Sequence, residues 1–107
     1  MIKDLRNRIS KKYYESAKLY LKMKKFSSAF YYFDIIISEY YDTDYFDQAL
    51  ISYIFTYIVM GNYSEAEIYF ESNKKNFNDI QNQFEAKRIL TDYKDGLGLS
   101  GFYRLYK

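Results

Sequence analysis

The chain of 107 residues contains no cysteine, no histidine and no proline. Without cysteine, it can form no disulfide and offers no thiolate metal ligand and no thiol nucleophile. Without histidine, it lacks the usual general base and the commonest metal ligand of proteins. The sequence therefore predicts a non-catalytic protein with no metal and no cofactor.

Long apolar runs are also missing. No segment reaches the about 20 consecutive apolar residues that a membrane-spanning helix needs. The opening segment MIKDLRNRIS is charged and has no apolar centre, so it does not resemble a signal peptide. The net charge of +2 is too small to indicate binding to nucleic acid or to an anionic membrane. Taken alone, the sequence predicts a cytoplasmic chain or a piece of a longer precursor.

The residues that are present predict a helical chain. The absence of proline permits long helices, and apolar residues recur at spacings of three and four along five segments. Helices are expected at about 3–23, from 26 to the EYYDTD segment, at 45–60, from 62 to about 75, and at 81–94. The sequence also holds 15 tyrosines and 9 phenylalanines, and tyrosine suits half-buried positions because its hydroxyl can reach water. The predicted fold class is all-α.

Several residues predict where these helices begin and end. Gly61 is expected to stop the third helix, because glycine tolerates the left-handed conformation best. Asn62, with Glu65 three residues later, resembles a capping box for the fourth helix. Thr43 or Asp44 is expected to cap the third helix, with Asp47 falling in its first turn.

A nine-residue pattern occurs twice. The segment KFSSAFYYF at 25–33 and the segment NYSEAEIYF at 62–70 are offset by 37 residues. At the same offset the following pairs agree: Tyr20 with Tyr57, Phe26 with Tyr63, Ala29 with Ala66, Phe33 with Phe70, Tyr40 with Phe77, and Asp42 with Asp79. A small alanine between large aromatic residues marks a place where two antiparallel helices approach closely. A fixed period of this length predicts stacked helical hairpins.

The pattern resembles the tetratricopeptide repeat (TPR), whose helix pairs stack into an α-solenoid. Two repeats fit, at about 10–42 and 47–79, and 81–94 resembles the first helix of a third and would cap the stack. The resemblance implies one domain over 1–95, followed by a glycine-punctuated tail over 96–107. The sequence departs from the family at Tyr41 and Asn78, where proline is usual, at Asn73, where a small residue is usual, and at Ser16, where a larger apolar residue is usual.

A narrower resemblance covers about 5–79. The elements LRNRI at 5–9, AKLYLK at 17–22 and YYDT at 40–43 are similar to the C-terminal repeats of the BamD family, the lipoproteins of the outer-membrane β-barrel assembly machine. This implies a scaffold at the periplasmic face of the outer membrane, docking assembly subunits or segments of barrel substrates. The family's lipid-bearing cysteine, signal peptide and N-terminal repeats are missing from this sequence. A basic residue by which some members meet their barrel-forming partner falls on Tyr32.

The TPR resemblance also places a binding groove. In such a stack the first helix of each pair lines the concave side, where peptides or partner helices bind. The residues expected to face this groove are Tyr14, Lys18, Gln48, Ile51 and Phe55. Tyr14 and Phe55 could anchor an apolar side chain, and Lys18 could bind a carboxylate. The alternative is that Ile51 and Phe55 simply pack on the next helix.

Two other functions stay open. One is a generic cytosolic TPR adaptor, or an adaptor of the Tol-Pal type. The other is an RNA-binding helical repeat, suggested by these lysines of the first hairpin: Lys11, Lys12, Lys18, Lys22, Lys24 and Lys25. RNA binding needs one basic stripe with exposed stacking rings. Acidic residues follow these lysines at once and most of the rings fall on core positions, so the sequence favours a protein partner and no nucleic acid.

Two motifs imitate binding sites. The segment GLGLSG at 96–101 spells the dinucleotide-binding fingerprint, but a helix precedes it where that mechanism needs a strand. We interpret Gly96 as a helix stop that begins a tail. Asp42, Asp44 and Asp47 suggest calcium, but they lack the glycine and the terminal glutamate of an EF-hand loop. We interpret them as loop and capping residues.

Overall fold

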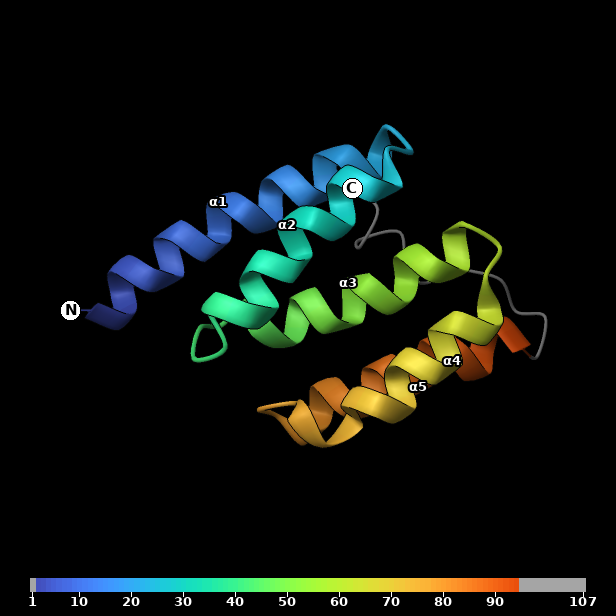
Figure 1. Ribbon diagram of the computed structural model, residues 1–107. Helices are drawn as coiled ribbons and strands as arrows, with labels where there is room; N and C mark the ends of the chain where they lie inside the picture. The colour runs from blue at the N-terminus through green and yellow to red at the C-terminus, as the bar shows by residue number, and fades with distance from the viewer. Residues whose placement is uncertain (1, 95–107) are drawn as a thin grey trace.

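The computed structural model describes residues 2–94, and within them it contains α-helices and no strand. The elements are α1 (Ile2–Lys22), α2 (Phe26–Glu39), α3 (Phe46–Val59), α4 (Tyr63–Asn73), the short 3₁₀ helix η1 (Lys74–Asn76) and α5 (Ile80–Lys94) (Figure 1). The all-α class and the five predicted helices are confirmed. The predicted tail and its GLGLSG motif lie outside the described residues.

The helices pack as a row of neighbours. α1 lies along α2, α2 lies along α3, and α3 packs on its other side against α4 and α5 (Figure 1). α3 is therefore the central helix, with ten buried residues in its 14. This position explains its composition, because a helix that is covered on several sides must be apolar nearly all round.

The predicted repeat is present in the backbone. α1 and α3 end 37 residues apart, at Lys22 and Val59, and α2 and α4 begin 37 residues apart, at Phe26 and Tyr63. Ala29 and Ala66 are both fully buried between the helices of their hairpins. The same helix ends and the same small residues at both seams show one hairpin used twice.

The turn inside each hairpin repeats in its hydrogen bonds. The amide of Lys25 donates to the carbonyl of Tyr20 at 2.9 Å, and the amide of Asn62 donates to that of Tyr57 at 2.8 Å. One residue earlier, Lys24 donates to Leu21 and Gly61 donates to Ile58, both at 2.9 Å. This pair of bonds is the Schellman motif, which satisfies the last carbonyls of a helix.

The motif requires a left-handed residue at the same place in each turn. Gly61 has a φ of 81°, as the sequence predicted, and Lys24 has a φ of 59°. An L-residue in this conformation brings its Cβ close to the following carbonyl oxygen. The first turn therefore carries backbone strain that the second turn avoids.

The predicted helix caps are only partly right. Asn62 is the N-cap residue of α4, but its side chain makes no capping hydrogen bond. The N-cap of α3 is Tyr45, so the prediction of Thr43 or Asp44 is wrong. Thr43 is instead buried and donates its hydroxyl back to the carbonyl of Tyr40 at 2.8 Å. Asp44 accepts a hydrogen bond from Asn7 of α1 at 3.0 Å.

An exposed ion pair holds the loop between α2 and α3. Nη2 of Arg6 donates to Oδ1 of Asp42 at 2.7 Å, and Nε donates to the same oxygen at 3.0 Å and to Oδ2 at 3.1 Å. Nη2 of Arg6 also donates to the carbonyl of Glu39, at 2.6 Å. The guanidinium lies 4.9 Å from the ring centroid of Tyr40. The hydrogen bond from Arg6 lowers the pKa of Asp42 below its ordinary value.

A buried carboxylate holds the loop between α4 and α5. Asp47 of α3 is 5% exposed. Its Oδ1 accepts the amide of Asn78 at 2.8 Å, and its Oδ2 accepts the amide of Asp79 and the side chain of Asn82, both at 2.9 Å. The side chain of Asn78 donates to the carbonyl of Tyr41 at 3.0 Å and so ties the two loops together.

Candidate functional site

Two of the predicted groove residues come together on α1. The ammonium of Lys18 lies 5.4 Å from the ring centroid of Tyr14, within the range of a cation–π contact. The Tyr14 ring lies 5.5 Å from the ring of Tyr45, at the start of α3, and 6.2 Å from that of Phe33. Both Tyr14 and Lys18 are half-buried. They form a joint polar and aromatic surface beside α3.

The other three groove residues lie on α3, and only one is accessible there. Gln48 is half-buried. Ile51 is fully buried and Phe55 is 1% exposed, in the same core cluster as Ala86 and Ile89 of α5. The expectation that these two side chains line an open groove is therefore corrected: both are buried in the core between the packed helices, in line with the alternative. Binding of a partner by Tyr14, Lys18 and Gln48 stays a prediction.

A cluster of aromatic rings fills the seam between α2 and α3. The ring centroid of Phe30 lies 4.5 Å from that of Tyr53 and 4.9 Å from that of Tyr57. Tyr53 also stacks on Tyr69 of α4, with centroids 4.3 Å apart and ring planes 7° from parallel. Ring pairs at these separations contribute stability beyond the apolar area that they bury.

The aromatic cluster changes the titration of its polar groups. The hydroxyl of Tyr53 donates to Oδ2 of Asp34 over 3.5 Å. Burial raises the pKa of Tyr53 and that of Tyr69. Desolvation also raises the pKa of Asp34, which remains an exposed residue at the rim. The charged forms of all three groups are thus disfavoured beside the rings.

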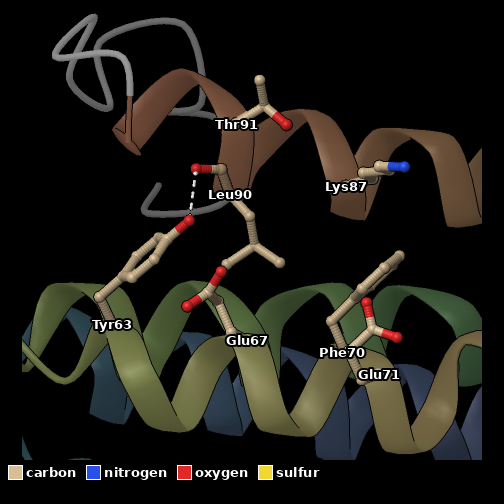
Figure 2. A pocket seen from close by; sticks show the side chains of 7 residues that line it. All are labelled: Tyr63, Glu67, Phe70, Glu71, Lys87, Leu90 and Thr91. Atoms are coloured by element: carbon tan, nitrogen blue, oxygen red, sulfur yellow. Dashed lines mark hydrogen bonds between the residues drawn. The ribbon is translucent and has the colours of Figure 1, made fainter.

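A cleft of ≈ 360 Å³ lies between α4 and α5 (Figure 2). The residues that line it are Tyr63, Glu67, Phe70 and Glu71 of α4, and Lys87, Leu90 and Thr91 of α5. The hydroxyl of Tyr63 donates to the carbonyl of Leu90 at 3.2 Å and closes one end of the cleft (Figure 2). The Tyr63 ring also stacks on that of Tyr93, with centroids 5.5 Å apart.

The cleft combines an apolar wall with a charged rim. Phe70 and Leu90 are 5% and 6% exposed and belong to the core cluster. Glu67, Glu71 and Lys87 are exposed. Glu71 is paired with Lys74, at 2.9 Å between Oε2 and Nζ. Glu67 reaches from α4 toward Leu90 (Figure 2) and has no hydrogen bond or ion pair within residues 2–94.

The sequence did not predict this cleft. Its acidic residues lie on the second helix of a hairpin, whereas the TPR resemblance places the binding residues on the first helices. The signal that could have found it is one departure from the repeat, because Glu67 stands where the first hairpin has Phe30.

The acidic loops carry no metal site in the described part of the chain. Asp42, Asp44, Asp47 and Asp79 line a cavity of ≈ 540 Å³ together with Lys3, Tyr41, Thr43, Asn78 and Asn82. Within residues 2–94, no group of three or more acidic side chains has an arrangement that could hold a metal ion. None of the described helices has the length and apolar character needed to cross a membrane.

Comparison with known proteins adds no relative. The chain matches no protein-family model, no curated protein and no solved structure.

Proposed function

We propose that the chain is a non-catalytic helical-repeat scaffold that docks a protein partner. The observation that supports this is the duplicated hairpin, with the same turn hydrogen bonds and the same buried alanines in both copies. Stacked helical hairpins present an extended, preformed surface, and repeat proteins use such surfaces to bind other proteins. The absence of histidine and cysteine from the sequence is in line with a binding role.

The more specific proposal is a BamD-like assembly factor. It rests on the resemblance at 5–9, 17–22 and 40–43 and carries with it a position at the periplasmic face of the outer membrane. Arg6 and Asp42, which belong to two of these three elements, meet as an ion pair. In this proposal Tyr14 and Lys18 receive a terminal segment of an unfolded barrel substrate, and Lys18 pairs with its carboxylate.

A peptide titration tests the binding site. The probe is a fluorescent peptide with the sequence of a C-terminal strand of an outer-membrane β-barrel protein, ending in a free carboxylate. We expect saturable binding that Lys18→Glu weakens by about tenfold or more, since loss of a charge-assisted hydrogen bond and gain of repulsion exceed 1.4 kcal/mol. Lys12→Glu is the matched control, because Lys12 is an exposed lysine of the same helix. Equal weakening by both variants would refute the site.

The reading frame upstream of Met1 separates the specific proposal from the general one. A signal peptide that ends in a lipid-modified cysteine, found upstream in the same frame, supports a BamD-like factor. A stop codon just upstream of Met1 would leave the generic TPR adaptor as the better proposal. The peptide titration can fail without affecting this result, so the two experiments are independent.

A further inference from the structure

The cleft between α4 and α5 stands at the place in the repeat that the aromatic seam occupies between α2 and α3. α4 follows α2 at an offset of 37, and α5 begins 34 residues after α3, at Ile80 and Phe46. Equivalent backbone hydrogen bonds support the offset of 34 residues. The amide of Ala49 donates to the carbonyl of Tyr45 at 2.9 Å, and the amide of Gln83 donates to the carbonyl of Asp79 at 3.3 Å. Each side chain of one interface can therefore be compared with its counterpart in the other.

The second interface lacks the aromatic side chains that stand at the corresponding positions of the first. By these offsets Phe30 corresponds to Glu67, Asp34 to Glu71, Tyr53 to Lys87, and Tyr57 to Thr91. In the first interface Phe30 lies between Tyr53 and Tyr57, with ring centroids 4.5 Å and 4.9 Å away. In the second interface, the residues at these three aromatic positions are Glu67, Lys87 and Thr91, which carry no ring. A cleft of ≈ 360 Å³ remains between the helices there. The cleft thus lies where the first interface is filled by the ring of Phe30.

The walls of the cleft still suit a ring. Phe33 in the first hairpin corresponds to Phe70, which lines the cleft together with Leu90 and Tyr63. The volume falls in the range of about 300–1,000 Å³ that is typical of ligand sites. At the rim, Glu71 is already paired with Lys74 at 2.9 Å, whereas Glu67 reaches toward Leu90 and makes no such pair within residues 2–94, so Glu67 can receive a cation (Figure 2).

We propose that this cleft binds an aromatic side chain of a partner protein that is flanked by a lysine or an arginine. The ring enters the cleft beside Phe70 and Leu90, where the first interface holds the ring of Phe30, and the cation pairs with Glu67. The inference rests on the proposed scaffold function and names the chemistry of one partner segment. It is separable from the α1 surface, because Lys18 there selects a carboxylate and the cleft selects a cation.

An NMR titration of the full chain tests the ligand chemistry. The probe is N-acetyl-Phe-Arg-amide, and backbone amide shifts are followed up to about 10 mM peptide, since a single small anchor is expected to bind with millimolar affinity. We expect saturable shifts at Tyr63, Lys87 and Thr91. N-acetyl-Ala-Arg-amide lacks the ring and N-acetyl-Phe-Glu-amide reverses the charge, so each is expected to bind at least about tenfold more weakly. Equal shifts with all three peptides, or no saturable shift, would overturn the proposal.

Substitutions at one position test the location. Glu67→Phe restores the ring of the first interface, so the variant is expected to lose binding of N-acetyl-Phe-Arg-amide and to melt at a higher temperature. Glu65→Phe makes the same change at an exposed residue of α4 outside the cleft and is expected to bind as the parent chain does. Glu67→Gln keeps the shape, guards against a folding failure, and is expected to weaken binding by about tenfold. Unchanged binding by Glu67→Phe or Glu67→Gln refutes the site.

The same spectra distinguish two other occupants. Without peptide, cleft shifts that depend on protein concentration would assign the cleft to a second copy of the chain. Shifts produced at Lys87 and Thr91 by Phe102→Ser and Tyr103→Ser in the full chain would assign it to the chain's own C-terminal segment, which lies outside the described residues. Either result overturns the assignment to a partner protein.

Discussion

The loop after α2 and the loop after α4 stand at equivalent places in the two hairpins, but different groups hold them. Arg6 and Asp42 hold the first loop with side chains that are 29% and 43% exposed. The 5% exposed carboxylate of Asp47 holds the second loop through two backbone amides. Exposed ion pairs contribute little, whereas an unmade hydrogen bond at a buried group is costly. The second loop should therefore depend on one residue far more than the first does.

The largest expected effect is that of Asp47→Ala. The change leaves two backbone amides and the Asn82 side chain without their acceptor, so the free energy of unfolding is expected to fall by about 3 kcal/mol. Urea unfolding followed by circular dichroism measures it. Asp44→Ala removes an exposed carboxylate of the other loop and is expected to cost less than about 1 kcal/mol. Equal losses in the two variants would show that the loops do not differ as described.

The next effect should be the same in both hairpins. Ala29→Leu and Ala66→Leu each force a larger side chain into a fully buried seam, and each is expected to cost about 2 kcal/mol. Ser27→Leu places the same leucine on an exposed position of α2 and should change stability by less than about 0.5 kcal/mol. Thermal unfolding compares the three. A large difference between the two alanine sites would mean that the hairpins are not equivalent in packing.

The turns should respond in opposite directions. Gly61→Ala is expected to cost about 1 kcal/mol, because φ is 81° there while nothing lies within 4 Å of the added Cβ, so the effect is one of backbone conformation alone. Lys24→Gly relieves the same strain and is expected to stabilise the fold by about 0.5 kcal/mol, since the freer unfolded chain offsets part of the gain. Chemical denaturation of both variants measures the effects. A Lys24→Gly variant that is clearly destabilised would contradict the equivalence of the turns.

The smallest effect concerns pH. Because its folded-state pKa is lowered, Asp42 stabilises the fold above its unfolded-state pKa of about 3.9, and this contribution disappears as the pH falls through the folded-state value. We expect the unfolding free energy of Asp42→Asn to fall less than that of the parent chain between pH 5 and pH 2. The difference should shrink in 1 M salt, because the pair is exposed. If the unfolding free energy of the parent chain varied with pH as little as that of the variant, the Arg6–Asp42 pair would not be stabilising the first loop.

The hairpins could be predicted because they depend on local patterns. The spacing of apolar residues predicted the helices, and Gly61 predicted a turn whose equivalent in the first hairpin is at Lys24. The aromatic and alanine pattern predicted the seams, since side chains at such spacing must meet within one hairpin. These features involve residues close in the sequence or related by the repeat.

The remaining features depend on contacts between distant residues. Asp47 was predicted as an acid in a first turn and as a loop or capping residue, but it accepts hydrogen bonds from amides 31 and 32 residues away. Ile51 and Phe55 fit a groove by the repeat, and only the packing of the helices shows that both are buried in the core. The cleft lies where α5, which occupies the first-helix position of a third hairpin, faces the charged side chain of Glu67 on α4. The sequence of neither helix alone shows that the two meet.

The matching turns also bear on how such a chain can change its length in evolution. Residues 26–62 run from just after one turn to the equivalent place after the next, so they form a complete 37-residue unit with compatible ends. A tandem duplication of this segment would create one new junction, at which Asn62 precedes a second copy of Phe26 as it now precedes Tyr63. The chain could thus lengthen by a whole hairpin without inventing a new connection, while the charged residues that open the terminal cleft would stay at its end.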